Sequence, residues 1–556
     1  MIVGSASCHP GVPTLVVCTG FQLQIDIMKI IFRAVALVCL AGFATLGAQV
    51  TSIVPLPEAG PARNWHQLDL KTDGVPGISS ERAMKELLAG VQPKRTVIVA
   101  VIDGGTDTAH VDLRANLWTN PKEIAGNAKD DDGNGYADDI RGWDFIGGKD
   151  GRDVGPDTHE VTRLAARCKA GTSPYPPETC KTIMADFERE RAEVMGTLAQ
   201  VKKIDTVSRL VSKVLSAVIM RDSLTVERVQ AIVSNDPEVQ RAKSVFLQLN
   251  AQGLTRKEID DGLKEYESRA AFGLNPDFDS RKIVGDNYAD LTERYYGNND
   301  VTGPDALHGT HVAGIIGAVR GNNIGIDGIA PAVRLMIVRT VPDGDERDKD
   351  VANAIRYAAD NGANVINMSF GKGYSPEKKA VDDAVKYADA KGVLMIHAAG
   401  NDGEDNSKKV SFPTSMYEGG GRAQNWIEVG ASSWKTGDSL VATFSNYSKS
   451  LVDVFAPGVD IYSTVAGGKY ARDSGTSMAA PVVTGVAALL MGYFPNLTAA
   501  DVKRIILTSA TSHATEQVAA PGGKGSVAFG TLSATGAIVN AYEAVKMAQS
   551  MGALRP

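Results

Sequence analysis

Short runs of apolar and β-branched residues recur along this chain, and each run ends in glycine or in polar residues. Within a run the apolar residues follow one another without alternating with polar ones, which is typical of strands buried on both faces of a parallel sheet. The predicted strands cover residues 96–105, 334–341, 363–370, 392–401 and 426–433.

Stretches with helical periodicity lie between these runs, at residues 349–362 and 376–392. A series of strand, helix and strand predicts an α/β fold, with a doubly wound, mainly parallel sheet and helices on both faces. In such a sheet, ligands and catalytic groups collect at the carboxyl ends of the strands. Functional residues are therefore expected directly after the predicted strands.

Residues 150–282 have a different pattern, rich in Glu, Lys and Arg and without strand signals. An apolar stripe with helical spacing runs from Val207 to Ile219, and "TRKE" at 255–258 has the pattern of a capping box. This region is predicted to be a helical insertion that divides the α/β domain into residues 93–149 and 283–550. A polar extension, 49–92, precedes the domain and contains a short predicted helix at 80–88.

The first 48 residues have the pattern of an export signal. Met28, Lys29 and Arg33 precede an uncharged apolar run at 34–48, which is shorter than the about 20 residues that span a bilayer. We interpret residues 1–48 as an upstream segment and a signal peptide cleaved near Ala48. The protein is then exported to the periplasm or the outside and touches the membrane only through this segment, although an uncleaved anchor remains open.

The charge of the chain argues against one class of partner, and its cysteines raise the possibility of a disulfide. With 58 basic and 65 acidic side chains the net charge is −7, so nucleic acid is not expected as a partner. Of the five cysteines, only Cys168 and Cys180 lie beyond the predicted signal peptide. In an exported chain these two could form a disulfide, but the sequence does not show whether their side chains meet.

Three short segments carry residues of the kinds used in nucleophilic catalysis: Asp103 in "VIDGG", His308 in "HGTHVAG" and Ser477 in "GTSMAAP". A serine hydroxyl needs an imidazole to accept its proton, and the imidazole needs a carboxylate to fix its tautomer. At a helix start, Ser477 also offers its backbone N–H to an oxyanion, and Asn401 in "AAGN" can add a side-chain N–H. The simpler alternative for Ser477 is a helix cap.

His308 and His311 have a spacing that would suit a metal pair, but no third ligand lies at a useful distance in the sequence. His311 is therefore interpreted as structural.

Taken in the order Asp, His, Ser, these motifs resemble those of subtilisin-like serine peptidases, the subtilases. The resemblance covers about residues 93–149 and 283–548 and implies a serine endopeptidase that cleaves proteins or peptides through an acyl-enzyme. Asp103, His308 and Ser477 would form the triad, with Asn401 in the oxyanion hole. Gly104 stands where the family usually has Ser or Thr, so a hydrogen bond to Asp103 is expected to be missing.

A neutral imidazole predicts activity that rises through about pH 6–7 and is lost in acid.

The resemblance also implies a substrate pocket between two segments. Ser369, Phe370 and Gly371 would face Ala398, Ala399 and Gly400, and an extended substrate would add a strand at this edge. The acidic run 343–350 lies where the family binds residues upstream of the scissile bond. This run could give the protein a mild preference for substrates with basic side chains upstream of the scissile bond. The alternative is that the run is simply a solvated loop.

No organic cofactor is expected, but two structural calcium sites are. Asp130, Asp132, Asn134 and Asp138 have the spacing of an EF-hand loop, although Arg141 stands where its last glutamate would be. By resemblance, Asp112 and Asn322 would supply side-chain oxygens to a second site.

Two other functions remain open: a catalytically silent binding protein that uses the helical insertion, and a peptide ligase with the same triad. We expect a monomer.

Overall fold

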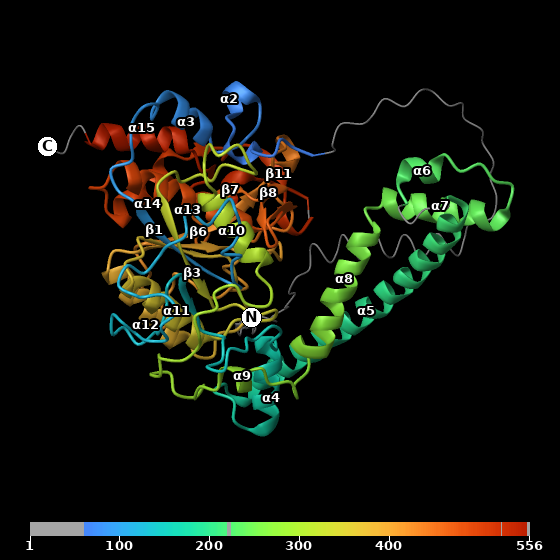
Figure 1. Ribbon diagram of the computed structural model, residues 1–556, viewed down its shortest axis with the longest axis horizontal. Coiled ribbons are helices and arrows are strands. Elements are labelled where there is room, and N and C mark those ends of the chain that lie inside the picture. Colours follow the sequence, from blue (N-terminus) through green and yellow to red (C-terminus); the bar gives the residue numbers. More distant parts are fainter. Residues whose placement is uncertain (1–59, 220–223, 524, 553–556) are drawn as a thin grey trace, which may run out of the picture.

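The computed structural model describes residues 60–219, 224–523 and 525–552 (Figure 1). The predicted signal peptide and its cleavage site near Ala48 lie outside the described residues, as does the first part of the extension 49–92.

One nine-stranded sheet forms the centre of the protein, in the order β10-β13-β7-β6-β5-β4-β1-β3-β2. All neighbouring strands are parallel except β10, which pairs antiparallel with β13. The predicted doubly wound, mainly parallel sheet is confirmed. The strands are β1 (Val97–Asp103), β2 (Gly142–Asp144), β3 (Val333–Arg339), β4 (Val365–Met368), β5 (Leu394–Ala398), β6 (Trp426–Ser432), β7 (Val454–Pro457), β10 (Thr511–Ser512) and β13 (Ala537–Ile538).

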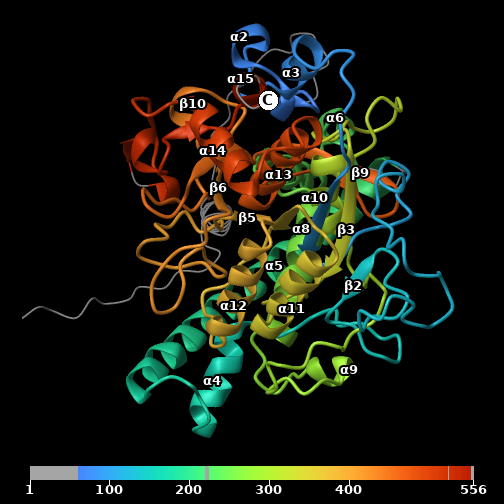
Figure 2. The same cartoon turned by 90° about the vertical axis from the view of Figure 1, so that its left-hand side faces the viewer.

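Helices cover both faces of this sheet (Figures 1 and 2). On one side lie α10 (Leu307–Gly317), α13 (Thr476–Tyr493), α14 (Ala499–Ser509) and α15 (Ala541–Gly552), and on the other α11 (Asp348–Asp360) and α12 (Lys378–Ala390). Successive residues of β1 point into these two cores, which is why its sequence is apolar throughout. Helix α13 is long and apolar enough to cross a membrane, but 94% of it is buried within the protein as its central helix.

The extension before the sheet packs onto the helices of the first face. It contains η1 (Trp65–Gln67), α2 (Leu70–Asp73) and α3 (Ser80–Glu86), which confirms the predicted short helix. Trp65 is fully buried, and its Nε1 donates to the carbonyl of Val459 at 3.1 Å. The described part of the extension, residues 60–92, is therefore part of the folded body.

Two small antiparallel pairs and several short turns complete the body. The pairs are β8 (Ile461–Val465) with β9 (Lys469–Asp473), and β11 (Gln517–Ala519) with β12 (Ser526–Ala528). The turns are the π-helical η2 (Arg269–Gly273) and the 3₁₀ helices η3 (Gly437–Ser439), η4 (Pro521–Gly523) and η5 (Phe529–Thr531).

Between β2 and α10 the chain forms the predicted helices, of which α5 and α8 extend from the body as an arm with α6 and α7 at its far end (Figure 1). They are α4 (Glu160–Ala170), α5 (Pro177–Ile219), α6 (Val226–Gln230), α7 (Pro237–Ala251), α8 (Arg256–Ser268) and α9 (Arg281–Val284). A disulfide between Cys168 and Cys180, left open by the sequence, joins α4 to α5.

The helices that pack on α5 cover only part of its apolar stripe. Val211 and Leu215 are buried against residues of α6 and α7, whereas Val207, Leu210 and Val218 remain exposed.

Candidate active site

Asp103 and His308 meet at the carboxyl edge of the sheet. Asp103 is the last residue of β1, and His308 lies in the first turn of α10. His308 Nδ1 donates to Asp103 Oδ1 at 2.8 Å, and the backbone N–H of Gly104 donates to the same oxygen at 2.7 Å. Asp103 Oδ2 is buried and has no hydrogen-bond partner among the described residues, as expected where Gly104 replaces a hydroxyl residue.

Ser477 lies in the first turn of α13, the helix that packs against α10. Its Oγ donates to the main-chain carbonyl of Ser369 at 3.1 Å, and the part of the chain that the structure describes gives it no hydrogen bond to His308. Its backbone N–H is among the first of the helix, which have no acceptor within the helix. A helix start thus places both a hydroxyl and a free N–H at this edge.

The side chain of Asn401 is oriented by the residue before Ser477. Asn401 Oδ1 accepts hydrogen bonds from the N–H and the hydroxyl of Thr476, at 2.8 and 2.9 Å. Its Nδ2 is therefore left for another acceptor, and this nitrogen lies on the side of Gly475, where a Cβ would be 3.5 Å away. The N–H groups of Asn401 and Ser477 are the two donors that an oxyanion would need here.

Acidic side chains around His308 set its pKa. Burial of the ring lowers this pKa, but the carboxylates of Asp103, Asp473 and Asp305 raise it to about 9. This is higher than the sequence indicates, because the sequence does not show that the charges of Asp473 and Asp305 act on the ring in addition to that of Asp103. A rise in activity with pH is therefore expected at more alkaline pH than the predicted pH 6–7.

The two predicted substrate segments follow neighbouring strands of the sheet. Residues 369–371 come directly after β4, and 398–400 lie at the end of β5, the strand paired with β4. Ser411 was not foreseen; its Oγ would be 2.6 Å from a Cβ at Gly371 and 3.6 Å from one at Gly400. Ser411 therefore lies between the two segments, at a position that no sequence motif marks.

His397 was missed as well, and it supports the first of these segments from behind. Its Nε2 donates to the carbonyl of Phe370 at 2.9 Å, and its Nδ1 donates to Glu428 at 2.8 Å. The carbonyl of Phe370 can only accept, so Nε2 carries hydrogen, and an ionised Glu428 beside Nδ1 favours the imidazolium form of the ring. Although burial lowers the pKa of His397, the Glu428 carboxylate raises it above the ordinary value.

Only part of the acidic run 343–350 pairs with cations of the protein. Asp348 pairs with Lys372 and Asp350 with Arg281, while Asp345 accepts the backbone N–H of Glu160. Asp343 is exposed and accepts the hydroxyl of Ser268, and neither it nor Asp345 has a Lys or Arg partner among the described ion pairs. The preference for basic upstream residues therefore stays a prediction.

The EF-hand-like loop brings only part of its predicted ligands together. Carboxylate oxygens of Asp130, Asp132 and Glu123 lie within 4.8 Å of one another, and Glu123 was not foreseen because it precedes the loop. Asn134 Nδ2 donates to Asp139. Asp138 turns away, because its carboxylate accepts the backbone N–H groups of residues 126–128.

The second predicted pair of ligands does meet. Asn322 Nδ2 donates to Asp112 Oδ1 at 2.6 Å, and Asp112 Oδ2 accepts hydrogen bonds from the backbone of Ile326 and from Tyr470.

His311 does not act with His308 on a metal in this arrangement. Its Nε2 lies within hydrogen-bond distance of the carbonyls of Ile461 and Ala471, and the described residues place neither histidine in a group of three metal-ligating side chains.

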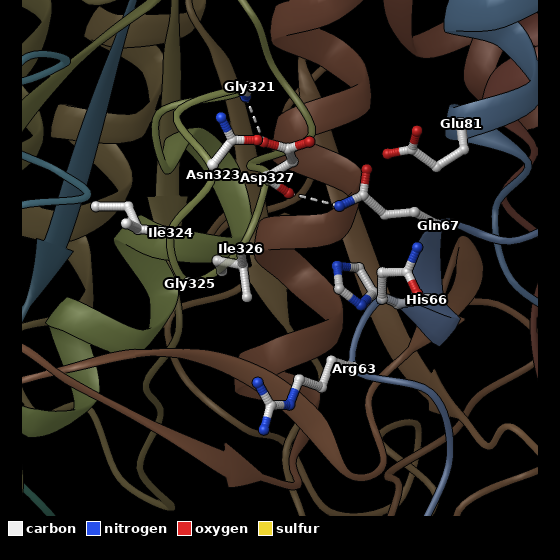
Figure 3. Close-up of a pocket in the computed structure, with 11 residues that line it drawn as sticks. Arg63, His66, Gln67, Glu81, Gly321, Asn323, Ile324, Gly325, Ile326 and Asp327 are labelled. Atoms are coloured by element: carbon white, nitrogen blue, oxygen red, sulfur yellow. Dashed lines mark hydrogen bonds between the residues drawn. The ribbon is translucent and has the colours of Figure 1, made fainter.

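A cavity of about 530 Å³ lies between the extension and residues 321–327 (Figure 3). Arg63, Gln67 and Glu81 line it, together with His66, whose buried ring has a pKa lowered to about 3 by burial and by His311. None of the predicted active-site residues lines this cavity.

Sequence comparisons identify known proteins that this chain resembles. The model of the subtilase family matches residues 94–525. A thermophilic serine proteinase of Bacillus sp. strain AK1 is 43% identical over 217 residues, which are 39% of this chain and 48% of that protein. An intracellular serine protease of Paenibacillus polymyxa is 36% identical over 257 residues, 46% of this chain and 71% of that protein.

A solved structure of a cold adapted subtilisin-like serine proteinase is 32% identical, with 43% of this chain and 77% of that chain covered and a TM-score of 0.34. The chain spans about half the length of the Bacillus relative. The family model nevertheless matches well over half of the chain, including the strands and helices that carry Asp103, His308 and Ser477. This chain therefore belongs to the subtilase family.

Proposed function

We propose that the chain is a serine endopeptidase that hydrolyses peptide bonds in proteins through an acyl-enzyme. Ser477 Oγ attacks the scissile carbonyl carbon while His308 Nε2 accepts its proton, and Asp103 holds the ring by the 2.8 Å bond to Nδ1. His308 then gives the proton to the leaving amine, and water hydrolyses the acyl-enzyme in the same way. The observation that carries the proposal is the Asp103–His308 bond on α10, together with a serine at the start of α13, the helix that packs against α10.

The developing oxyanion is stabilised by two N–H donors. Asn401 Nδ2 is one, because Thr476 holds the amide oxygen on the other side, and the backbone N–H of Ser477 is the second.

Substrate binding prepares the nucleophile. In the free protein Ser477 Oγ donates to the carbonyl of Ser369. When a substrate strand is added at this edge, the same carbonyl would accept a backbone N–H of the substrate. A bound peptide takes over the carbonyl and leaves the hydroxyl to turn toward His308.

Hydrolysis of a peptide library by the purified protein, compared with its Ser477→Ala variant, tests the proposal. We expect cleavage by the wild type and a loss of about 10⁴-fold or more in the variant. A folded wild type that binds peptides without cleaving them would favour the catalytically silent binding protein.

Export to the periplasm or the outside is the proposed location. The apolar segment 34–48 supports it, and so does the Cys168–Cys180 disulfide, since such bonds persist in oxidising compartments. The amino-terminal sequence of protein recovered from cultures should begin near Gln49. A mature chain that begins at Met1 or Met28 would count against export by cleavage.

Structural calcium is proposed at two places. Glu123, Asp130 and Asp132 are three mutually close carboxylates without a Lys or Arg partner among the described ion pairs, and Ca²⁺ prefers about six to eight such oxygen ligands. Asp112 and Asn322 would hold the second ion.

If calcium binds the folded state, a chelator should lower the melting temperature of the Ser477→Ala variant by several degrees, about 4–8 °C for each kcal/mol in a small domain and less in a larger one. Glu123→Gln or Asp112→Asn should each reduce this shift. An unchanged melting temperature in chelator would rule out both sites.

A further inference from the structure

The segment that follows the substrate edge is held by the base of the helical insertion. Lys372 Nζ pairs with Glu160 of α4 at 2.8 Å, and the hydroxyl of Tyr374 donates to Asp186 of α5 at 2.6 Å. Arg167 of α4 pairs with Glu377 at 3.1 Å. The insertion thus contacts residues 372–377 from two helices, which the Cys168–Cys180 disulfide joins to each other.

Lys372 also connects two segments near the proposed substrate edge: residues 369–377, in which it lies, and residues 343–348, which lead into α11. Beyond Glu160, its ammonium group contacts Asp348 at 2.9 Å and the main-chain carbonyl of Glu346 at 2.8 Å. The side chains of Lys372 and Glu160 are 2% and 3% exposed. Charges buried to this extent hold their geometry strongly, because any separation leaves them without water or a partner.

The backbone of Lys372 faces away from the proposed substrate. Its N–H and carbonyl pair with Phe412 at 3.0 and 2.9 Å, next to Ser411 in the pocket. Because the pairing direction of an extended segment alternates from residue to residue, the neighbouring Gly371 presents its backbone to the open side, and Gly371 is exposed. The position of Lys372 therefore fixes two neighbours: Gly371, whose backbone faces the open side, and the segment around Phe412 and Ser411 in the pocket.

We propose that the base of the insertion is part of the substrate site, with Glu160 and Lys372 as positioning residues that set the place of the substrate-binding segment 369–371. This inference rests on the proposed endopeptidase function and names the part of the chain that controls its peptide binding. An insertion that merely decorated the surface would not need a buried ion pair directly after this segment.

The chain provides a matched control for Lys372. Lys349 is 1% exposed and contacts the same kinds of groups, namely the carboxylates of Asp286 and Glu293 and the carbonyl of Asn287. Its partners lie outside segments 369–377 and 411–413. Lys372→Met and Lys349→Met therefore remove equivalent buried charges, but only the first should disturb the substrate edge.

Two substrates distinguish a displaced segment 369–371 from a general loss of folding or activity. One is a blocked tetrapeptide anilide that extends along residue 371, and the other is an acetylated single-residue ester that does not. For Lys372→Met we expect KM for the tetrapeptide to rise about tenfold while kcat for the ester stays within about twofold of the wild type. Lys349→Met should lower the melting temperature without changing the ratio between the two substrates. Equal losses on both substrates in Lys372→Met, or the same change in ratio in Lys349→Met, would overturn the inference.

A milder pair of variants guards against misfolding. Tyr374→Phe removes the 2.6 Å bond to Asp186, and Tyr296→Phe removes a 2.6 Å bond to Asp350 away from the site. Only Tyr374→Phe should raise KM for the tetrapeptide, and no difference between the two would contradict the proposal.

If the wild type cleaves neither substrate, the proposed function fails. Dissociation constants of a labelled tetrapeptide with the Ser477→Ala protein then decide the inference. Weaker binding after Lys372→Met alone supports it, and equal binding in all variants overturns it.

Discussion

An imidazole among three carboxylates must lose a proton before it can act as a base. The pKa of His308 is raised to about 9 by Asp103, Asp473 and Asp305 against the effect of burial. Only the neutral ring accepts the proton of Ser477. In the free protein, kcat/KM should therefore increase with pH and level off above about pH 9.

Removal of one of these charges should move the profile. Asp473→Asn deletes a carboxylate that raises the pKa of His308 without contacting the triad directly, so the midpoint of kcat/KM against pH should fall by about half a unit or more. Asp438→Asn, on an exposed turn, is the control. A wild-type midpoint near pH 6–7, or an unmoved midpoint in Asp473→Asn, would disagree with this account.

Ser411 is the residue that should limit the size of the side chain accepted before the scissile bond. Its Oγ lies within reach of both pocket segments, and Ser411→Gly would empty that space. Relative to alanine substrates, kcat/KM for aromatic substrates should rise about tenfold. Steady-state kinetics on the two substrate types, with Ser407→Gly on an exposed loop as control, measure the effect. An unchanged ratio would exclude Ser411 from the pocket.

Among the elements, strands β5 and β6 are linked by a buried ion pair whose strength depends on pH. His397 and Glu428 are cross-strand neighbours, and the folded pKa of His397 is raised. The contribution of the pair to stability is complete below the unfolded pKa of about 6.5 and is lost as pH rises through the higher folded pKa.

Denaturant unfolding of the Ser477→Ala protein, with and without His397→Gln, measures this contribution. The second substitution should cost about 2 kcal/mol at pH 6, and the difference should shrink as pH increases. A difference that grows with pH would mean that the ring is neutral in the folded protein.

The disulfide should stabilise the base of the insertion more than the sheet. It closes a loop of 12 positions between α4 and α5, for which chain entropy gives about 3 kcal/mol. In a Cys168→Ser, Cys180→Ser variant, amide exchange of residues 160–190 should become faster, while that of α13 should stay as in the wild type. Equal acceleration in both regions would show that the two parts unfold together.

Long apolar strands and helices could be predicted from the sequence, whereas short or half-exposed elements could not. β1 and β3 to β6 are apolar along most of their length because both faces are covered. β2 has three residues, and β9 contains Lys469, Arg472 and Asp473, so neither has a recognisable pattern. Their place depends on neighbours that are distant in the sequence.

The same distinction holds for the site. Asp103, His308, Asn401 and Ser477 lie in short local motifs, so their candidacy could be read from the sequence. Glu123, Ser411, His397 and Lys372 carry no motif, because each contacts the site from a segment whose position only the fold determines.

At the scale of the whole molecule, one sheet edge gathers side chains from four segments, and a disulfide-linked helical insertion holds residues 372–377 beside it. In the proposed mechanism Ser477 and His308 carry out the bond-making and proton-transfer steps. The rest of the chain holds these two residues in place and sets the charge around them.

Labelling with a fluorophosphonate, followed by peptide mass spectrometry, tests this central claim most directly. The account predicts one adduct per chain, on Ser477, formed at a rate that increases with pH up to about 9 and lost in His308→Ala. Modification of another residue, or labelling of Ser477 that proceeds equally fast without His308, would contradict it.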